Sequence, residues 1–263
     1  MLTVAAPWEY RWRFSILIVS QPVLALAVHW LSRSEGPWYA PTFSAMAGGL
    51  AVCLATIGIL LRVHATASLH ARVMASHNPD ASRFVTSAIY QVIRNPLYVS
   101  SLLLFGGYAV FFGGYWAVGY VLFHWLRYQR VIRLEETCLR EQWGIEFEDY
   151  CQKVPRWWPR WGQLRLPSLD ISKHGLMSNI VYVALWAGIV VSAVMRDLSW
   201  VIPFELTGGA VMAVLYRGRS ASVASPVESQ GIVLPPAIRT DASPSPEPPT
   251  LLKQTSVTAA PKS

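Results

Sequence analysis

Apolar runs long enough to cross a bilayer alternate with polar segments along most of this 263-residue chain. Because an α-helix rises 1.5 Å per residue, about 20 apolar residues are enough to span the hydrocarbon core. The pattern therefore predicts an all-α fold, that of a polytopic membrane protein. The apolar runs cover residues 14–31, 43–61, 97–126, 176–195 and 201–216.

The run 97–126 could form either one long helix or a tight hairpin of short helices that turns at Gly113-Gly114. Two ordinary spans would need about 40 residues, but the distribution of basic residues favours the hairpin. With a hairpin there are about six crossings, and 20 of the 22 Lys and Arg residues lie on the same side as the N-terminus. Since basic residues concentrate on the cytoplasmic side, both termini are predicted to be cytoplasmic. The cytoplasmic segments would be 1–13, 62–96, 127–175 and 217–263.

These segments divide the chain into four expected parts. Residues 1–61 would form two N-terminal membrane helices, 62–160 a core, 161–216 a linker and a C-terminal helix pair, and 217–263 a tail. The tail holds eight of the 18 prolines and no aromatic residue, so it is predicted to be disordered. The first apolar run could instead be a signal peptide cleaved near Ala25-Leu26-Ala27, but its length favours an uncleaved helix.

Composition narrows the class of protein further. Hydrophobic residues make up 53% of the chain and charged residues 14%, where about a quarter is usual. Together with a mean hydropathy of +0.33, this argues against a nucleic-acid partner despite the net charge of +7. The three cysteines form no CxxC pair, and His64, His70 and His77 lie at spacings of six and seven with no Cys or acidic residue between them. We therefore expect neither a disulfide scaffold nor a metal site.

Arg94 stands at the predicted start of the hairpin. Pro96 suits the first position of a helix, and Asn95 suits its N-cap. Arg94 would then lie at the membrane surface beside the positive end of a helix, a place that favours an anionic group. The alternative is an arginine that reaches towards lipid phosphate.

The second helix of the hairpin is expected to continue into an acidic pair. At helical spacing, Glu135 shares a face with apolar residues, whereas Glu136 lies between Arg133 and Arg140 on what reads as a solvated ion-pair face. Glu135 is therefore the more suitable ligand for a bound cation, and replacing Glu136 should have far less effect. The alternative role for Glu135 is an ion pair with Arg130 or Arg94.

Four motifs follow one another along the chain. They are Tyr90-x3-Arg94-Asn95-Pro96-x-Tyr98, the apolar hairpin, Glu135-Glu136-x2-Leu139-x3-Trp143-Gly144-x2-Phe147-x2-Tyr150 and Val154-Pro155-Arg156-x2-Pro159. In this order and spacing, they resemble the isoprenylcysteine carboxyl methyltransferase and phospholipid methyltransferase group of integral membrane enzymes. The resemblance covers about residues 62–160. Two departures stand out, because the common Gly-Pro-Tyr is Ala88-Ile89-Tyr90 and the common His before the proline is Asn95.

This resemblance implies that S-adenosylmethionine binds in a cytoplasmic pocket. An Arg about one turn before the acidic pair serves the substrate in eukaryotic members. Val131 occupies that position here, so Arg130 is the nearest candidate for a substrate contact. No catalytic side chain is expected, since the reaction would rest on positioning. The residues implied to contact the cofactor are Tyr90, Arg94, Asn95, Pro96, Leu97 and Tyr98 on one side, and Glu135 and Glu136 on the other.

The predicted function is a membrane methyltransferase that acts on a lipid-linked or apolar acceptor. The motif Arg-Asn-Pro-Leu-Tyr at residues 94–98 is typical of bacterial members and favours a bacterial inner membrane, whereas eukaryotic relatives reside in the endoplasmic reticulum. One alternative is an NADPH-dependent membrane reductase of the steroid-reductase type, disfavoured by Val99-Ser100-Ser101 after the motif but kept open by Arg156, Arg160 and Arg165. Another is a non-enzymatic scaffold or transporter, in which Arg94 and Glu135 would form a structural ion pair.

Overall fold

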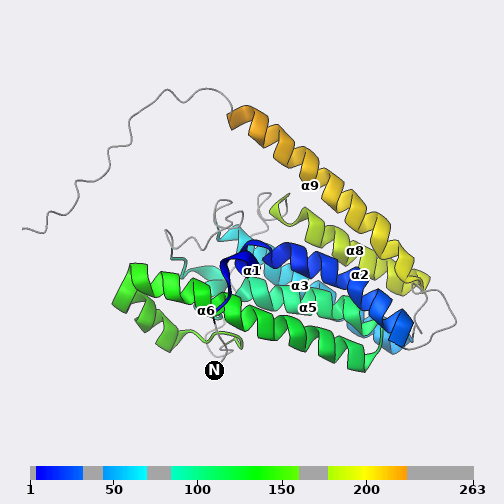
Figure 1. Ribbon diagram of the computed structural model, residues 1–263, viewed down its shortest axis with the longest axis horizontal. Helices are drawn as coiled ribbons and strands as arrows, with labels where there is room; N and C mark the ends of the chain where they lie inside the picture. The colour runs from blue at the N-terminus through cyan, green and yellow to red at the C-terminus, as the bar shows by residue number, and fades with distance from the viewer. Residues whose placement is uncertain (1–3, 32–43, 70–83, 160–176, 224–263) are drawn as a thin grey trace, which may run out of the picture. The chain divides into compact units, whose positions relative to one another are not determined.

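The computed structural model describes residues 4–31, 44–69, 84–159 and 177–223, and these residues are helical, with no strand among them. The all-α prediction is thereby confirmed for the described part of the chain (Figure 1). The described residues up to Ala221 belong to one compact unit. In order, the helices are α1 (Pro7–Arg11), α2 (Arg13–Leu31), α3 (Ala45–Ala67), η1 (Ala88–Gln91), α5 (Pro96–Val110), α6 (Gly114–Lys153), α8 (Ile180–Met195), η3 (Leu198–Trp200) and α9 (Val201–Val223).

Two of these helices, α2 and α3, are long and apolar enough to cross a membrane. The helices α5 and α8 and the stretch Leu198–Val211 are apolar but shorter. Large apolar side chains such as Val19 and Leu26 point outwards from α2, as lipid-facing residues do. The structure thus supports a membrane protein, while the six crossings stay a prediction.

The run 97–126 forms a helical hairpin, as the charge distribution predicted. α5 and α6 pack against each other and are joined by a turn at Gly113, whose φ of 100° lies in the region that glycine adopts without strain. The second helix continues into the acidic pair, as predicted. α6 has 40 residues and continues well past the apolar run, because residues 127–143 are rich in the Arg, Glu and Leu that favour helix.

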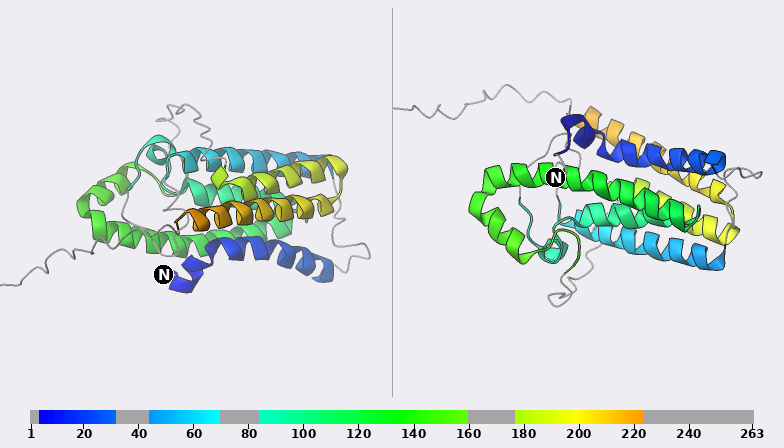
Figure 2. Two further views of the ribbon diagram at one scale, coloured as in Figure 1. Left: turned by 90° about the horizontal axis from the view of Figure 1, so that it is seen from above. Right: turned by 60° about the horizontal axis from the view of Figure 1, so that its bottom comes forward.

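α6 reverses its direction at Gly144. This residue has a φ of 47° and is the point at which two helical limbs meet. The second limb, residues 145–153, folds back towards η1, as the two views in Figure 2 show. The reversal brings the aromatic residues of the second limb against Phe84, whose ring lies 4.9 Å from that of Tyr150.

α3 and α5 lie in close backbone contact along their length. A Cβ atom on Gly58 would lie 2.8 Å from the backbone nitrogen of Leu104, and one on Gly107 would lie 2.7 Å from the carbonyl oxygen of Ala51. Real side chains do not come so close, so both positions require glycine at this helix separation.

Arg62 connects α3 to α5 and α8. Its side chain is buried, and it donates hydrogen bonds from Nε to Asn179 Oδ1 at 3.0 Å and from Nη1 to Ser101 Oγ at 3.0 Å. Its guanidinium also lies 3.5 Å from the ring centre of Tyr182 and donates to the carbonyl oxygen of Leu97 at 3.3 Å. The sequence placed Arg62 at the start of a polar segment, but α3 continues to Ala67 and Arg62 lies inside the packed helices.

Candidate functional site

The first part of the site is the start of α5. Asn95 takes the N-cap position and Pro96 the first helical position, as predicted. The Asn95 side chain does not cap the helix but donates from Nδ2 to the carbonyl oxygen of Arg156 at 3.4 Å. The backbone N–H of Arg94 likewise donates to the carbonyl oxygen of Pro155 at 2.9 Å. These two bonds join the Arg-Asn-Pro motif to the Val-Pro-Arg motif.

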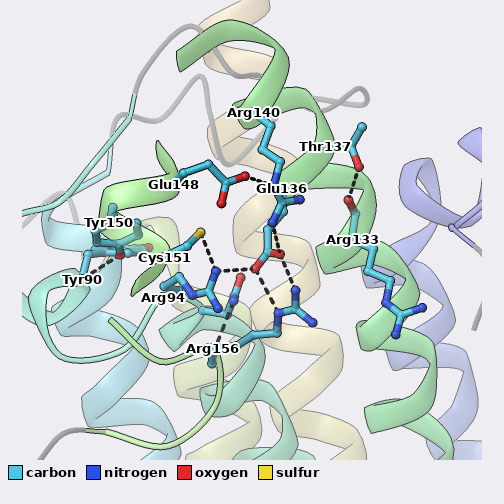
Figure 3. Close-up of polar contacts among 11 residues, drawn as sticks. Tyr90, Arg94, Arg133, Glu136, Thr137, Arg140, Glu148, Tyr150, Cys151 and Arg156 are labelled. Carbon is cyan, nitrogen blue, oxygen red and sulfur yellow. Dashed lines mark hydrogen bonds and ion pairs between the residues drawn. The ribbon is translucent and has the colours of Figure 1, made fainter. Parts of the chain in front are cut away.

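Glu136 lies at the centre of a cluster of three arginines. Its carboxylate is 3.2 Å from Nη1 of Arg94 and 3.7 Å from Nη2 of Arg140. Arg156 donates two hydrogen bonds to it, one from Nε at 3.0 Å and one from Nη2. Figure 3 shows these side chains converging on Glu136 from the segment before α5, from α6 and from the segment after α6.

The prediction that Glu136 is solvated is wrong, because only 3% of its surface is exposed. The helical spacing did place Glu136 on a basic face, and Arg140 is one of its partners. That face is covered, however, by the second limb of α6 and by the segment that follows it. The closed arginine cluster therefore makes Glu136 the anchor for Arg94 rather than a surface residue.

The second limb of α6 supports this cluster and brings Tyr90 close to it. Arg140 Nε lies 2.6 Å from Glu148 Oε1, which joins the two limbs across the reversal. The hydroxyl of Tyr150 donates to the carbonyl oxygen of Tyr90 at 2.7 Å. Phe147 is buried and packs edge-on against Phe84. The Trp-Gly-x2-Phe-x2-Tyr motif thus encodes a reversal and the aromatic contacts that hold it closed.

Cys151 is a site residue that no sequence motif indicated. Nη1 of Arg94 donates to its Sγ at 2.7 Å. Burial raises the pKa of the Cys151 thiol, while the nearby Arg94 guanidinium acts in the opposite direction. Cys151 therefore acts as a neutral hydrogen-bond acceptor that holds the Arg94 side chain from a second side.

Glu135 occupies a separate, aromatic environment. It accepts a hydrogen bond from the hydroxyl of Tyr98 at 2.7 Å and another from the hydroxyl of Tyr10. The predicted apolar face is confirmed, since Val131 and Ile132 are fully buried in a cluster with these tyrosines. Burial raises the pKa of Glu135, and the two phenol hydrogen bonds counteract that rise. The carboxylate thus sits in a poorly solvated place where a cation would be favoured.

The two arginines considered as ion-pair partners for Glu135 pair with other carboxylates. Arg94 pairs with Glu136, and Arg130 pairs with Glu9 at 3.2 Å. The carboxylate of Glu9 is buried. Neither Glu9 nor Tyr10 belongs to the recognised motifs, and their role could not be read from helical spacing because it depends on how the N-terminus packs on α6.

Two buried donors near the cluster are left unpaired within the part of the chain that the structure describes. They are Nε of Arg94 and Nε1 of Trp157.

No group of three potential metal ligands occurs among the described residues, and His70 and His77 lie outside them. Deeper in the bundle, α2, α5 and α6 pack around a gap that leaves no room for a water molecule, and its lining includes Leu17, Phe105 and His124.

The chain is similar in sequence to known methyltransferases. The sequence model of the phospholipid methyltransferase family matches residues 43–146, which include α3, α5 and both acids of the Glu135–Glu136 pair. Two curated proteins, from Oryza sativa subsp. indica and Oryza sativa subsp. japonica, are each described as a probable protein-S-isoprenylcysteine O-methyltransferase. Each is 27% identical over 146 residues, which is 53% of this chain and 76% of the relative. No solved structure matches.

Proposed function

We propose that the chain, which matches the sequence model of the phospholipid methyltransferase family over residues 43–146, is an integral membrane methyltransferase that uses S-adenosylmethionine. Its acceptor would be lipid-linked or apolar. The observation that carries the proposal is the 3.2 Å contact between Arg94 and Glu136, which brings the start of α5 together with the acidic pair of α6. The same matches favour a methyltransferase over an NADPH-dependent reductase or a non-enzymatic scaffold.

The polar groups of the site fit the polar groups of S-adenosylmethionine. The Nε–H of Arg94 and the indole N–H of Trp157, which have no partner among the described residues, are suitable donors to the ligand's carboxylate and ring acceptors. Glu135, which lies among aromatic side chains, suits the cationic end of the ligand, because carboxylates and aromatic faces both attract cations. Tyr90, Asn95, Pro96, Leu97 and Tyr98 would form the wall between these two ends.

Glu136 has a different role in this proposal from Glu135. Its carboxylate is already surrounded by Arg94, Arg140 and Arg156, so it would hold Arg94 in place rather than contact the cofactor. Arg130 stays the proposed substrate contact, but its guanidinium is paired with Glu9 and would have to share that partner with an acidic acceptor.

Bound S-adenosylmethionine would supply an electrophilic methyl group on a sulfonium sulfur. The chain would contribute orientation and the exclusion of water, for which effective molarity can lower a barrier by roughly 7–11 kcal/mol. A carboxylate or thiolate acceptor is already nucleophilic, so the protein needs no general base. Arg94 and Glu135 would fix the donor, and the acceptor would approach from the membrane side.

For the membrane arrangement we propose about six crossings, with both termini and the site on the cytoplasmic side. The basic residues of the site support this arrangement, because basic residues concentrate on the cytoplasmic side of membrane proteins. A single crossing by residues 97–126 would place the basic residues of α6 on the opposite side of the bilayer. A bacterial inner membrane is the proposed location. An acceptor that enters sideways from the bilayer would explain why such a methyltransferase is built into a membrane.

Calorimetric titration of the detergent-purified full chain tests the proposal. We expect S-adenosylmethionine and S-adenosylhomocysteine to bind, and NADPH not to bind. Arg94→Ala and Glu135→Ala should each weaken S-adenosylhomocysteine binding at least tenfold, because a charged partner loses its contact, worth about 1.5 kcal/mol. The exposed Glu141 provides the control, since Glu141→Ala should bind like the wild type. Binding of NADPH alone would overturn the assignment.

A further inference from the structure

The N-terminal segment, residues 5–13, lies along α6 and is fastened to it at both ends. The backbone N–H of Ala5 donates to the carbonyl oxygen of Arg130 at 3.2 Å. Further along, Nη2 of Arg127 donates to the carbonyl oxygen of Arg13 at 3.1 Å. We call residues 5–13 the N-terminal strap. It precedes residues 43–146, the part of the chain that the family sequence model matches.

Two buried side chains of the strap reach residues of the candidate site. Glu9 is 3% exposed and lies 3.2 Å from Arg130. Tyr10 is also 3% exposed, and its hydroxyl hydrogen-bonds to Glu135. Such burial leaves little freedom for either side chain, so the strap and the acid are held in one geometry.

Arg13 contacts both the ring and the backbone of Tyr10. Its guanidinium carbon lies 4.0 Å from the centre of the Tyr10 ring, and its Nη1 donates to the carbonyl oxygen of Tyr10 at 3.0 Å. The phenol of Tyr10 therefore points towards Glu135 because both its backbone and its ring are constrained. Tyr98 approaches the same carboxylate from α5, with its ring 4.8 Å from that of Tyr128.

We propose that Tyr10 is a positioning residue of the cofactor site, which together with Tyr98 aims the carboxylate of Glu135 at the cationic end of the methyl donor. The strap would then complete a site whose other parts come from the family core. This inference rests on the proposed function, because it takes Glu135 as a ligand of S-adenosylmethionine. It adds a residue, and an element of the chain, that the family motifs do not contain.

The hydroxyl of Tyr10 has a chemical effect that a packing residue would lack. Burial raises the pKa of Glu135, and the hydrogen bonds from Tyr98 and Tyr10 lower it, as does nearby Arg13. Glu136 acts to raise it. Removing the Tyr10 hydroxyl should therefore raise the pKa of Glu135, so its carboxylate becomes protonated at a higher pH during acidification. The other titratable groups that interact with Glu135 are Tyr90 and Cys138.

The test is the pH profile of S-adenosylhomocysteine binding to the full chain, measured by calorimetry from pH 5.5 to 8.5. In Tyr10→Phe we expect the acidic loss of binding to begin about half a pH unit higher than in the wild type. At the alkaline end the affinity should fall only a few-fold, since the phenyl ring keeps the packing. Tyr115→Phe is the matched control, because Tyr115 is 96% exposed and should leave the profile unchanged.

A second variant, Glu9→Gln, loosens the strap without removing a partner of Glu135. We expect it to weaken S-adenosylhomocysteine binding and to speed hydrogen exchange in residues 5–13, while bound ligand slows that exchange in the wild type. Identical pH profiles for wild type and Tyr10→Phe, with ligand bound in both, would overturn the inference and leave the proposed function intact. Failure of the wild type to bind either S-adenosylmethionine or S-adenosylhomocysteine would overturn both.

Discussion

The guanidinium of Arg94 lies 3.2 Å from the carboxylate of Glu136, and this contact joins the start of α5 to the middle of α6. Sequence motifs that are separated by the whole hairpin therefore meet through one buried ion pair. The pair is reinforced on one side by Arg156 and on the other by Cys151.

Replacing Glu136 with alanine should destabilise the protein strongly. Three guanidinium groups would lose their shared anion, and removing one member of a buried ion pair typically costs about 3–5 kcal/mol. We expect the low end of that range, because Arg140 is 42% exposed and water can solvate it. Denaturant unfolding in detergent, with Glu141→Ala as the exposed control, measures the difference. A Glu136→Ala variant as stable as Glu141→Ala would contradict the anchoring role.

The hydrogen bonds of Asn179 should matter for the stability of the protein. Asn179 accepts from Arg62 and donates to Thr66 Oγ1 at 2.6 Å, so Asn179→Ala leaves buried polar atoms unpaired. We expect a loss of about 1–3 kcal/mol in the free energy of unfolding. Thr207→Ala, which removes an exposed hydroxyl bonded only within its own helix, is the control. Equal stability of the two variants would contradict this prediction.

Glycine replacements should distinguish the helix interface from the lipid-facing surface. Gly107→Ala places a methyl group 2.7 Å from the backbone of α3 and should destabilise the protein by about 1–3 kcal/mol. Gly49→Ala meets nothing within 4 Å and should be neutral or stabilising, since alanine favours helix by roughly 1 kcal/mol over glycine. Thermal unfolding of the two variants tests this. A stable Gly107→Ala protein would mean that α3 and α5 can separate.

Cys151 should react slowly with alkylating reagents at neutral pH. Burial raises the pKa of its thiol. At neutral pH the reactive thiolate is therefore scarcer than in an ordinary cysteine. Iodoacetamide labelling followed by peptide mass spectrometry should show Cys151 reacting more slowly than free glutathione at pH 7.5. Unfolding in denaturant should remove the difference. Fast labelling of the folded protein would show that Arg94 outweighs burial and holds a thiolate.

Local patterns predicted the start of α5, which depends on neighbours in the sequence, and the distribution of basic residues along the chain predicted the hairpin. Pro96 and Asn95 define a helix start wherever they occur before an apolar run, and the spacing around Glu135 was enough to identify its apolar face. The burial of Glu136 could not be predicted in the same way. It depends on Gly144 reversing α6 and on Arg156 returning to the cluster, which are contacts between segments far apart in the chain.

The same limit applies to the residues outside the motifs. Arg62 was assigned to a polar loop because it follows an apolar run, but its partners Asn179 and Tyr182 belong to α8. Tyr10 reaches Glu135 only once the N-terminus lies on α6. In both cases, a single sequence contains no periodic signal that links the two partners.

The continuity of α6 has a mechanical consequence. Between Gly114 and Trp143 the backbone keeps helical geometry, so the part of α6 in the hairpin and the part that carries the acidic pair form one stiff rod. A bulky acceptor that entered between α5 and α6 within the bilayer would move α6 as a rigid body. Glu135 and Glu136 would then shift relative to Arg94. Arrival of the acceptor could thereby tighten or loosen the grip on the methyl donor without any direct contact between the two ligands.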